Sequence, residues 1–205
     1  MKSYPSIASS TGQNFRAFEA YVFDKLDGSN LRWEWSLRRG WYKFGTRNRL
    51  FDESDPDFRP AIEIFFRDFA DPLTEFALRE RWGGCVAFTE FWGQNSFAGL
   101  HDLQDEKHLS LIDMSVLKKG FMHPKDFAKL GTIVPSAAYL GKVNWTRGFV
   151  DQVRNGELED VTFEGVVGKC MTGRKRIMAK AKTQAWVDKV RSLYEPIEAE
   201  RIIQS

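Results

Sequence analysis

The chain has 205 residues, of which 42% are hydrophobic and 28% are charged, so its length allows one large domain or at most two small ones, and its composition is that of an ordinary globular protein. Thirty basic and 28 acidic residues leave a formal net charge of +2, which excludes a histone-like polycation but not a local basic patch. Cys85 and Cys170 form no CxxC pair, and no segment has the apolar length of a signal peptide or a membrane span, so we expect a reduced, soluble, cytoplasmic protein with no membrane partner.

Alternating and β-branched runs predict seven strands. In chain order these are Tyr21–Lys25, Leu31–Leu37, Trp41–Thr46, Cys85–Trp92, Leu109–Val116, Val161–Val167 and Arg176–Ala181. Residues 27–30 are predicted to form a turn between the first two strands, and residues 39–40 a hairpin turn between the second and third. Because polar and apolar residues alternate in the second strand, we expect Trp33 and Trp35 to lie in the core.

Five helices are predicted among these strands. They cover Ala61–Phe69, a segment from Asp71 to Gly83, Pro124–Leu130, Thr146–Asn155 and a C-terminal segment in which Trp186, Val190 and Leu193 share one face. We expect Asp71 to cap the second helix, because a proline follows at the first helical position. Strands and helices without regular strand–helix–strand alternation predict an α+β fold of antiparallel sheets flanked by helices. No linker divides the sequence, so we expect one domain over residues 1–205, with residues 196–205 able to fray.

The segment Lys25-Leu26-Asp27-Gly28-Ser29-Asn30 places a lysine at the end of a predicted strand, before a turn that contains glycine. Such a lysine can be held in a pocket with its amine directed at a phosphate group. The alternative is a plain hairpin turn with a solvated lysine.

Three later carboxylate and lysine positions favour the phosphate interpretation. Glu164 stands at the mouth of a β-branched strand, and Lys180 and Lys182 lie on one face of another strand because side chains alternate with a period of two. A bound polyphosphate makes two like charges on one face favourable, whereas a solvated face only tolerates them. Glu90 lies on an otherwise apolar strand face and needs a partner there, unless it reaches water from an edge strand.

Together and in this order, the segments resemble the covalent nucleotidyltransferase superfamily of ATP-dependent DNA ligases, RNA ligases and mRNA capping enzymes. The resemblance covers most of the chain, and the matching positions, for motifs I, III, IV and V in turn, are Lys25–Gly28, Glu90, Glu164–Val167 and Lys180–Lys182. Arg47 stands where the family has an arginine after motif I. Within the superfamily, the sequence from Lys25 to Asn30 is similar to the branch of phage RNA-repair ligases. The implied fold is a ligase adenylation domain.

The resemblance implies a reaction with ATP. Lys25 would attack the α-phosphate, expel pyrophosphate and form a lysyl-AMP. Lys180 and Lys182 would lower the pKa of the attacking amine by like-charge repulsion and would then stabilise charge on the α-phosphate. Glu164 would hold Mg²⁺ or Mn²⁺, which neutralises the triphosphate.

The resemblance also implies nucleotide-binding roles for other side chains. Glu90 would accept hydrogen bonds from the ribose hydroxyls, and Arg47 would contact the ribose or the phosphates. Asn30 would lie beside the nucleotide or the receiving strand end, and Asp24 would help to read the adenine edge. Asp27 agrees with the common family residue.

One position, Ile112, departs from the family pattern. Ile112 stands where the family often stacks an aromatic ring on the adenine, so it would be an aliphatic substitute. Separately, His101, His108 and His123 have acidic residues near them but match the spacing of no known metal site, so a polar surface loop is expected instead.

AMP would then move to the 5′-phosphate of a nucleic acid, and attack by a 3′-hydroxyl would seal the strand. RNA is favoured as this nucleic acid, and DNA is the alternative. The basic segment Arg174–Arg176 is a candidate phosphate contact, although it could equally be a solvated hairpin tip. The hairpin cluster Arg38-Arg39 is a weaker candidate.

Little sequence follows Lys182, so no OB domain of the kind found in DNA ligases and capping enzymes is expected. The chain would then be a bare, monomeric adenylyltransferase domain, with a protein partner as one source of the missing contacts. The leading hypothesis is an ATP-dependent RNA ligase. The alternatives are a minimal DNA ligase, a capping guanylyltransferase, and a module that binds nucleotides or nucleic-acid ends without turnover.

Overall fold

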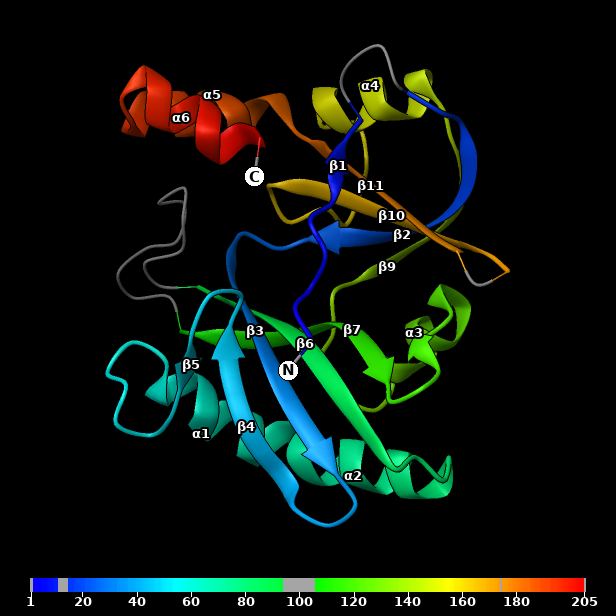
Figure 1. Cartoon of the computed structure of the whole chain (residues 1–205). Coiled ribbons are helices and arrows are strands. Elements are labelled where there is room, and N and C mark those ends of the chain that lie inside the picture. Colours follow the sequence, from blue (N-terminus) through cyan, green and yellow to red (C-terminus); the bar gives the residue numbers. More distant parts are fainter. Residues whose placement is uncertain (1, 11–14, 94–105, 174, 205) are drawn as a thin grey trace. The chain divides into compact units, whose positions relative to one another are not determined.

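The computed structural model describes residues 2–10, 15–93, 106–173 and 175–204 (Figure 1). The chain divides into two compact units. Unit 1 comprises Met1–Tyr4 and Gly28–Ala137, and unit 2 comprises Pro5–Asp27 and Ala138–Ser205. Each unit contains one sheet together with helices, so the predicted α+β fold is confirmed. The expectation that the whole chain acts as one domain stays a prediction.

The sheet of unit 1 is antiparallel throughout. Its strands, in spatial order, are β5 (Leu50–Phe51), β4 (Gly40–Thr46), β3 (Gly28–Ser36), β6 (Gly84–Trp92), β7 (His108–Val116) and β8 (Gly120–Phe121). The predicted strands in this part of the chain are all present, and the predicted hairpin joins β3 to β4. Strand β6 is buried along most of its length because it has a neighbour on each side and apolar residues on both faces.

Helices α1 (Arg59–Asp68) and α2 (Ala70–Arg79) pack against one face of this sheet, and α3 (Pro124–Leu130) follows β8 (Figure 1). The ring of Trp33 stacks on that of Phe65 from α1, with centroids 4.1 Å apart, which confirms the core position expected for this tryptophan. The prediction that Asp71 caps α2 is wrong. Buried Phe69 donates its backbone N–H to the Phe65 carbonyl, so α2 begins directly after α1 and Asp71 lies in its first turn.

The sheet of unit 2 has five strands. In spatial order they are β1 (Ala8–Ser9), β11 (Lys175–Lys182), β10 (Gly165–Thr172), β2 (Phe18–Lys25) and β9 (Tyr139–Trp145). Only the short β1 is parallel to its neighbour. Strand β9 was not predicted, because it lies at the sheet edge and Trp145 is its single fully buried residue.

Two predictions about these strands need correction. The turn predicted at residues 27–30 is shorter, because β3 already begins at Gly28. The alternative of a plain hairpin is excluded, because β2 pairs with β9 and β10 whereas β3 pairs with β4 and β6. Strand β10 begins at Gly165 and not at Val161, because the residues before it bond to Asp24 instead of joining the ladder.

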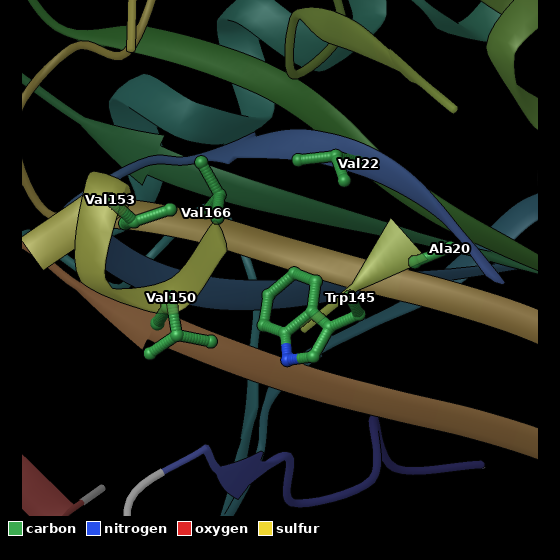
Figure 2. Packing of buried hydrophobic residues seen from close by; sticks show 7 residues of the cluster. Ala20, Val22, Trp145, Val150, Val153 and Val166 are labelled. Carbon is green, nitrogen blue, oxygen red and sulfur yellow. The ribbon is translucent and has the colours of Figure 1, made fainter. Parts of the chain in front are cut away.

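The core of unit 2 surrounds Trp145, which is 0% exposed (Figure 2). Val150 and Val153 from helix α4 (Arg147–Asn155) pack against it, as do apolar side chains of β2 and β10. Gly168 makes room for the indole, since a Cβ at this position would lie 2.4 Å from the ring. The core therefore requires glycine in the middle of a strand.

Helices α5 (Gln184–Leu193) and α6 (Pro196–Gln204) complete unit 2. Trp186 and Val190 are buried on one face of α5. Leu193, which was expected on the same buried face, is instead 49% exposed. The segment expected to fray instead forms α6, which buries Ala199 and Ile202. In the described part of the chain, no helix combines the length and apolar character that a membrane crossing requires.

Candidate active site

Glu164 joins two of the predicted site lysines. Lys25 ends β2, Lys182 ends β11, and both lie opposite Gly165 at the start of β10. Glu164 Oε2 lies 2.6 Å from Lys25 Nζ, and its Oε1 lies 3.1 Å from Lys182 Nζ. One buried carboxylate therefore pairs with two ammonium groups, at the point where three strand ends meet.

Gly165 makes this arrangement possible. Its φ of +140° is rarely adopted by residues with a side chain, and a Cβ here would lie 2.1 Å from the Ala181 carbonyl oxygen. The backbone of Glu164 is held in addition by the Thr183 N–H, which donates to its carbonyl at 3.0 Å. The position of the carboxylate thus follows from the local backbone.

The end of α6 supplies acceptors to the lysine pair of β11. Lys180 Nζ donates to the Gln204 carbonyl at 3.2 Å, and Lys182 Nζ donates to the Ile202 carbonyl at 3.3 Å. The last carbonyls of a helix lack intrahelical partners and carry the negative end of its dipole, so they suit cations. Lys182 also lies 4.0 Å above the Trp186 ring.

Burial lowers the pKa of Lys182 below its usual range. The Glu164 carboxylate opposes this shift, and the positive charge of Lys25 adds to it. For Lys182, desolvation has a larger effect on the pKa than the charge of Lys25. The expectation that Lys180 and Lys182 lower the pKa of the Lys25 amine stays a prediction.

Asp24 and Asp27 flank the nucleophile candidate in the chain and are both buried. Asp24 accepts hydrogen bonds from the Thr162 N–H at 3.1 Å and from its hydroxyl at 2.9 Å. Burial raises the pKa of Asp24, and the Thr162 hydrogen bonds only partly offset this. In this structure Asp24 anchors the segment before β10, and its role toward adenine stays a prediction.

The remaining predicted nucleotide-binding residues lie in unit 1. Asn30 and Glu90 are direct partners across β3 and β6, and Asn30 Nδ2 donates to the Thr89 carbonyl at 3.4 Å. Arg47 is exposed in the turn just after β4, at the same end of the sheet. Ile112 is the extra residue of a bulge in β7, where the register with β6 shifts.

One buried cation of unit 2 was missed by the sequence analysis. Lys169 in β10 is 2% exposed, and its Nζ lies 4.6 Å from the centre of the Phe23 ring. It lies four residues after Gly165 on the same strand, so its side chain is on the face that carries Lys25. The two-residue period of the strand could have revealed this position.

The other predicted features lie apart from this cluster. His108 is in β7, and His123 caps α3 by accepting the Lys125 N–H at 3.2 Å. Across the residues that the structure describes, there is no group of three side chains suited to hold a metal ion. Arg174 and His101 lie outside the described residues.

Comparison with known proteins finds likeness in structure alone. No protein-family model and no curated protein matches the chain. An archaeal ATP-dependent RNA ligase superposes with a TM-score of 0.66 at 19% identity, over 100% of this chain and 56% of that one. A mutant RNA ligase of Naegleria gruberi with ATP and Mn superposes with a TM-score of 0.60 at 17% identity, over 83% of this chain and 51% of that one. A second Naegleria mutant, with AMP and Mn, gives 0.59 at 17% identity.

The chain therefore has the fold of the nucleotidyltransferase domain of ligases. More narrowly, the similar structures are ATP-dependent RNA ligases, and the likeness covers most of this chain. The resemblance found in the sequence is confirmed at the level of the fold. The chain spans about half the length of the ligases it matches.

Proposed function

We propose that this protein is an ATP-dependent RNA ligase in which Lys25 becomes covalently adenylylated. The observation that carries the proposal is the Glu164 carboxylate held between Lys25 and Lys182, in a fold shared with RNA ligases. A plain hairpin with a solvated lysine does not account for this geometry, because Lys25 is only 21% exposed and its strand is not part of a hairpin.

In the proposed reaction, the Lys25 amine attacks the α-phosphorus of ATP. A nitrogen–phosphorus bond forms, and the bond to the pyrophosphate oxygen breaks. Only the neutral amine has the electron pair for this attack, and Glu164 is the carboxylate placed to accept the proton that Lys25 gives up. AMP then moves to a 5′-phosphate, and a 3′-hydroxyl displaces it as the strand is sealed.

Lys180 and Lys182 are proposed to bind the phosphate oxygens around the reacting phosphorus. Their present acceptors on α6 are neutral carbonyls. A phosphate oxygen carries negative charge and forms a stronger, charge-assisted hydrogen bond. Lys180 is buried and the Lys182 side chain is 8% exposed. These two lysines on one strand face are therefore suited to exchange the carbonyls for phosphate.

The side chains present also fit a divalent ion accompanying ATP. Mg²⁺ or Mn²⁺ is commonly bound by one or two carboxylates together with phosphates and water, and Glu164 is the carboxylate that would hold it. The ion would neutralise charge on the triphosphate. We propose that Glu90 binds the ribose and that Arg47 contacts the ribose or the phosphates. Asp24 and Ile112 are proposed to contact the adenine.

The proposal is tested by incubating the protein with α-labelled ATP and Mg²⁺ and separating it on a denaturing gel. We expect label on the wild type and on Lys142→Ala, a matched exposed lysine of β9, and none on Lys25→Ala. No label on any of them, under varied metal and pH, would overturn the proposal. Rapid labelling without another protein would speak against the predicted partner.

The substrate class is tested with nicked RNA and nicked DNA duplexes under the same conditions. Sealing of nicked RNA in preference to nicked DNA supports the RNA ligase. Preferential sealing of DNA indicates the minimal DNA ligase, and an adduct formed with GTP in place of ATP indicates a capping guanylyltransferase. Nucleotide binding without an adduct indicates the module without turnover.

A further inference from the structure

Two hairpin tips of unit 1 share one sequence pattern. Leu37-Arg38-Arg39 joins β3 to β4, and Leu117-Lys118-Lys119 joins β7 to β8; we call these two segments the twin tips. Each tip is followed by a glycine with positive φ. Each leucine is 62% exposed, although leucine is a residue that folding usually buries.

The twin tips lie beside each other at the start of β6. The Leu37 N–H donates to the Gly83 carbonyl at 3.4 Å, and the Leu117 N–H donates to the Gly84 carbonyl at 2.9 Å. Strands β3 and β7 are the two neighbours of β6, so two strand spacings separate the tips, on the order of 10 Å.

The four basic side chains of the twin tips are exposed. Arg39 lies 5.2 Å from the Tyr42 ring, and within the described residues no ion pair engages any of the four. Arg81 adds a fifth cation two residues before Gly83, and the nearby Glu80 is 3.9 Å from Arg79. The twin tips alone carry four positive charges, whereas the whole chain has a net charge of +2.

We propose that the twin tips bind duplex RNA. Four exposed like charges repel one another weakly through water, and a polyanion that lies against them adds a strong attraction. A separation on the order of 10 Å lets each basic pair reach one of the two phosphate backbones that border a groove, while the leucines contact the sugars and base edges between them. The inference rests on the proposed function only for the choice of RNA as the polyanion.

The experiment measures binding by fluorescence anisotropy, without ATP, to a blunt RNA duplex of about 16 base pairs that has no 5′-phosphates. The salt concentration is varied between about 50 and 200 mM, because each neutralised phosphate adds about 0.9 to the slope of log affinity against log salt for a B-form duplex. The readout is therefore both an affinity and a count of phosphate contacts.

Three double variants separate the roles of charge and of apolar surface. Arg38→Gln with Arg39→Gln, and Lys118→Gln with Lys119→Gln, should each lower the salt slope by about 2 and weaken binding about tenfold or more. Leu37→Ser with Leu117→Ser should weaken binding several-fold with the slope unchanged. The control removes two exposed arginines of α4, with Arg147→Gln and Arg154→Gln, and should leave the slope unchanged.

Several outcomes would overturn the inference. One such outcome is that both basic variants keep the wild-type slope of log affinity against log salt while their thermal stability is unchanged. A second such outcome concerns phosphatidylserine vesicles. If the wild type binds these vesicles, and the leucine variant loses that binding but keeps the wild-type affinity for RNA, the tips are assigned to a membrane surface. Labelling of Lys25 with ATP is measured in parallel. A wild type that binds RNA through the twin tips but takes no label refutes the proposed function alone, whereas normal labelling with unaltered RNA binding in all tip variants refutes this inference alone.

Discussion

Replacing Glu164 with glutamine removes the negative charge that lies between the Lys25 and Lys182 ammonium groups while keeping the size of the side chain. The loss of one partner of a buried ion pair costs about 3–5 kcal/mol. Lys182 is 8% exposed and Lys25 is 21% exposed, so solvent screens part of the effect at Lys25. We therefore expect the lower end of the range, about 3 kcal/mol, which lowers the melting temperature of a chain this long by about 6–12 °C.

The matched control is Glu19→Gln, which breaks the Lys142 to Glu19 ion pair of the same sheet at the same separation of 2.6 Å. That pair is exposed on both sides, so its loss should leave the melting temperature almost unchanged. Both variants are unfolded thermally and in urea at pH 7, with tryptophan fluorescence as the signal and circular dichroism as a second probe.

The effect of pH tests whether charge is the cause. Burial already lowers the pKa of Lys182, and removing the carboxylate lowers it further. The unfolded state of the variant then binds protons more tightly than the folded state, so its stability rises as pH rises toward the ordinary lysine value of about 10.4. The deficit against wild type should shrink between pH 7 and pH 10. Equal losses in the two glutamine variants, or a deficit that does not change with pH, would refute the reasoning.

Three further predictions concern unit 2 and the two cysteines. Gly165→Ala should lower the free energy of unfolding by more than about 3 kcal/mol, because its φ is positive and a Cβ would meet a carbonyl oxygen at 2.1 Å. Gly148→Ala, in helix α4, should instead raise the free energy of unfolding by up to about 1 kcal/mol, because a Cβ there would meet only Thr146 Oγ1, at 3.9 Å. Urea unfolding compares the two variants. Because burial raises the pKa of Asp24, its contribution to stability is present at low pH and is lost as pH rises through the folded-state value, so Asp24→Asn should be more stable than wild type at pH 7 and equal to it near pH 3; equal stability at both values would contradict this. Burial raises the pKa of the Cys85 thiol to about 12, so iodoacetamide at pH 8 should modify the half-buried Cys170 first, as mass spectrometry of the peptides would show, and faster labelling of Cys85 would contradict it.

The elements that the sequence predicts best are those whose pattern is local. Strand β3 alternates polar and apolar residues, and α3 begins with a proline, so both were predicted within a few residues of their observed bounds. The partners of β2 could not be predicted in this way. Its pairing with β10 joins residues about 140 positions apart, and nothing in the turn after Lys25 shows that the chain leaves one sheet for another.

The candidate site also has features that could be predicted from the sequence and features that could not. The resemblance to the nucleotidyltransferase superfamily implied that Lys25, Glu164 and Lys182 act together, and the structure brings their charged atoms to within 2.6 and 3.1 Å. The α6 carbonyls that receive Lys180 and Lys182 could not be anticipated, because a main-chain acceptor leaves no trace in residue identity. A short helix that derives its order from tertiary packing also resembles a tail when only its sequence is considered.

Gly165 and Gly168 are required because a side chain would not fit at either position, and not because they take part in chemistry. Gly165 lies against a carbonyl oxygen, and Gly168 lies against the Trp145 ring. Under the proposed function, a descendant that stopped reacting with ATP could lose Lys25 without unfolding, but it could not easily exchange either glycine. Among divergent sequences, these two glycines would therefore trace the ancestry of the fold, whereas joint retention of Lys25 and Glu164 would mark the relatives that keep the proposed activity.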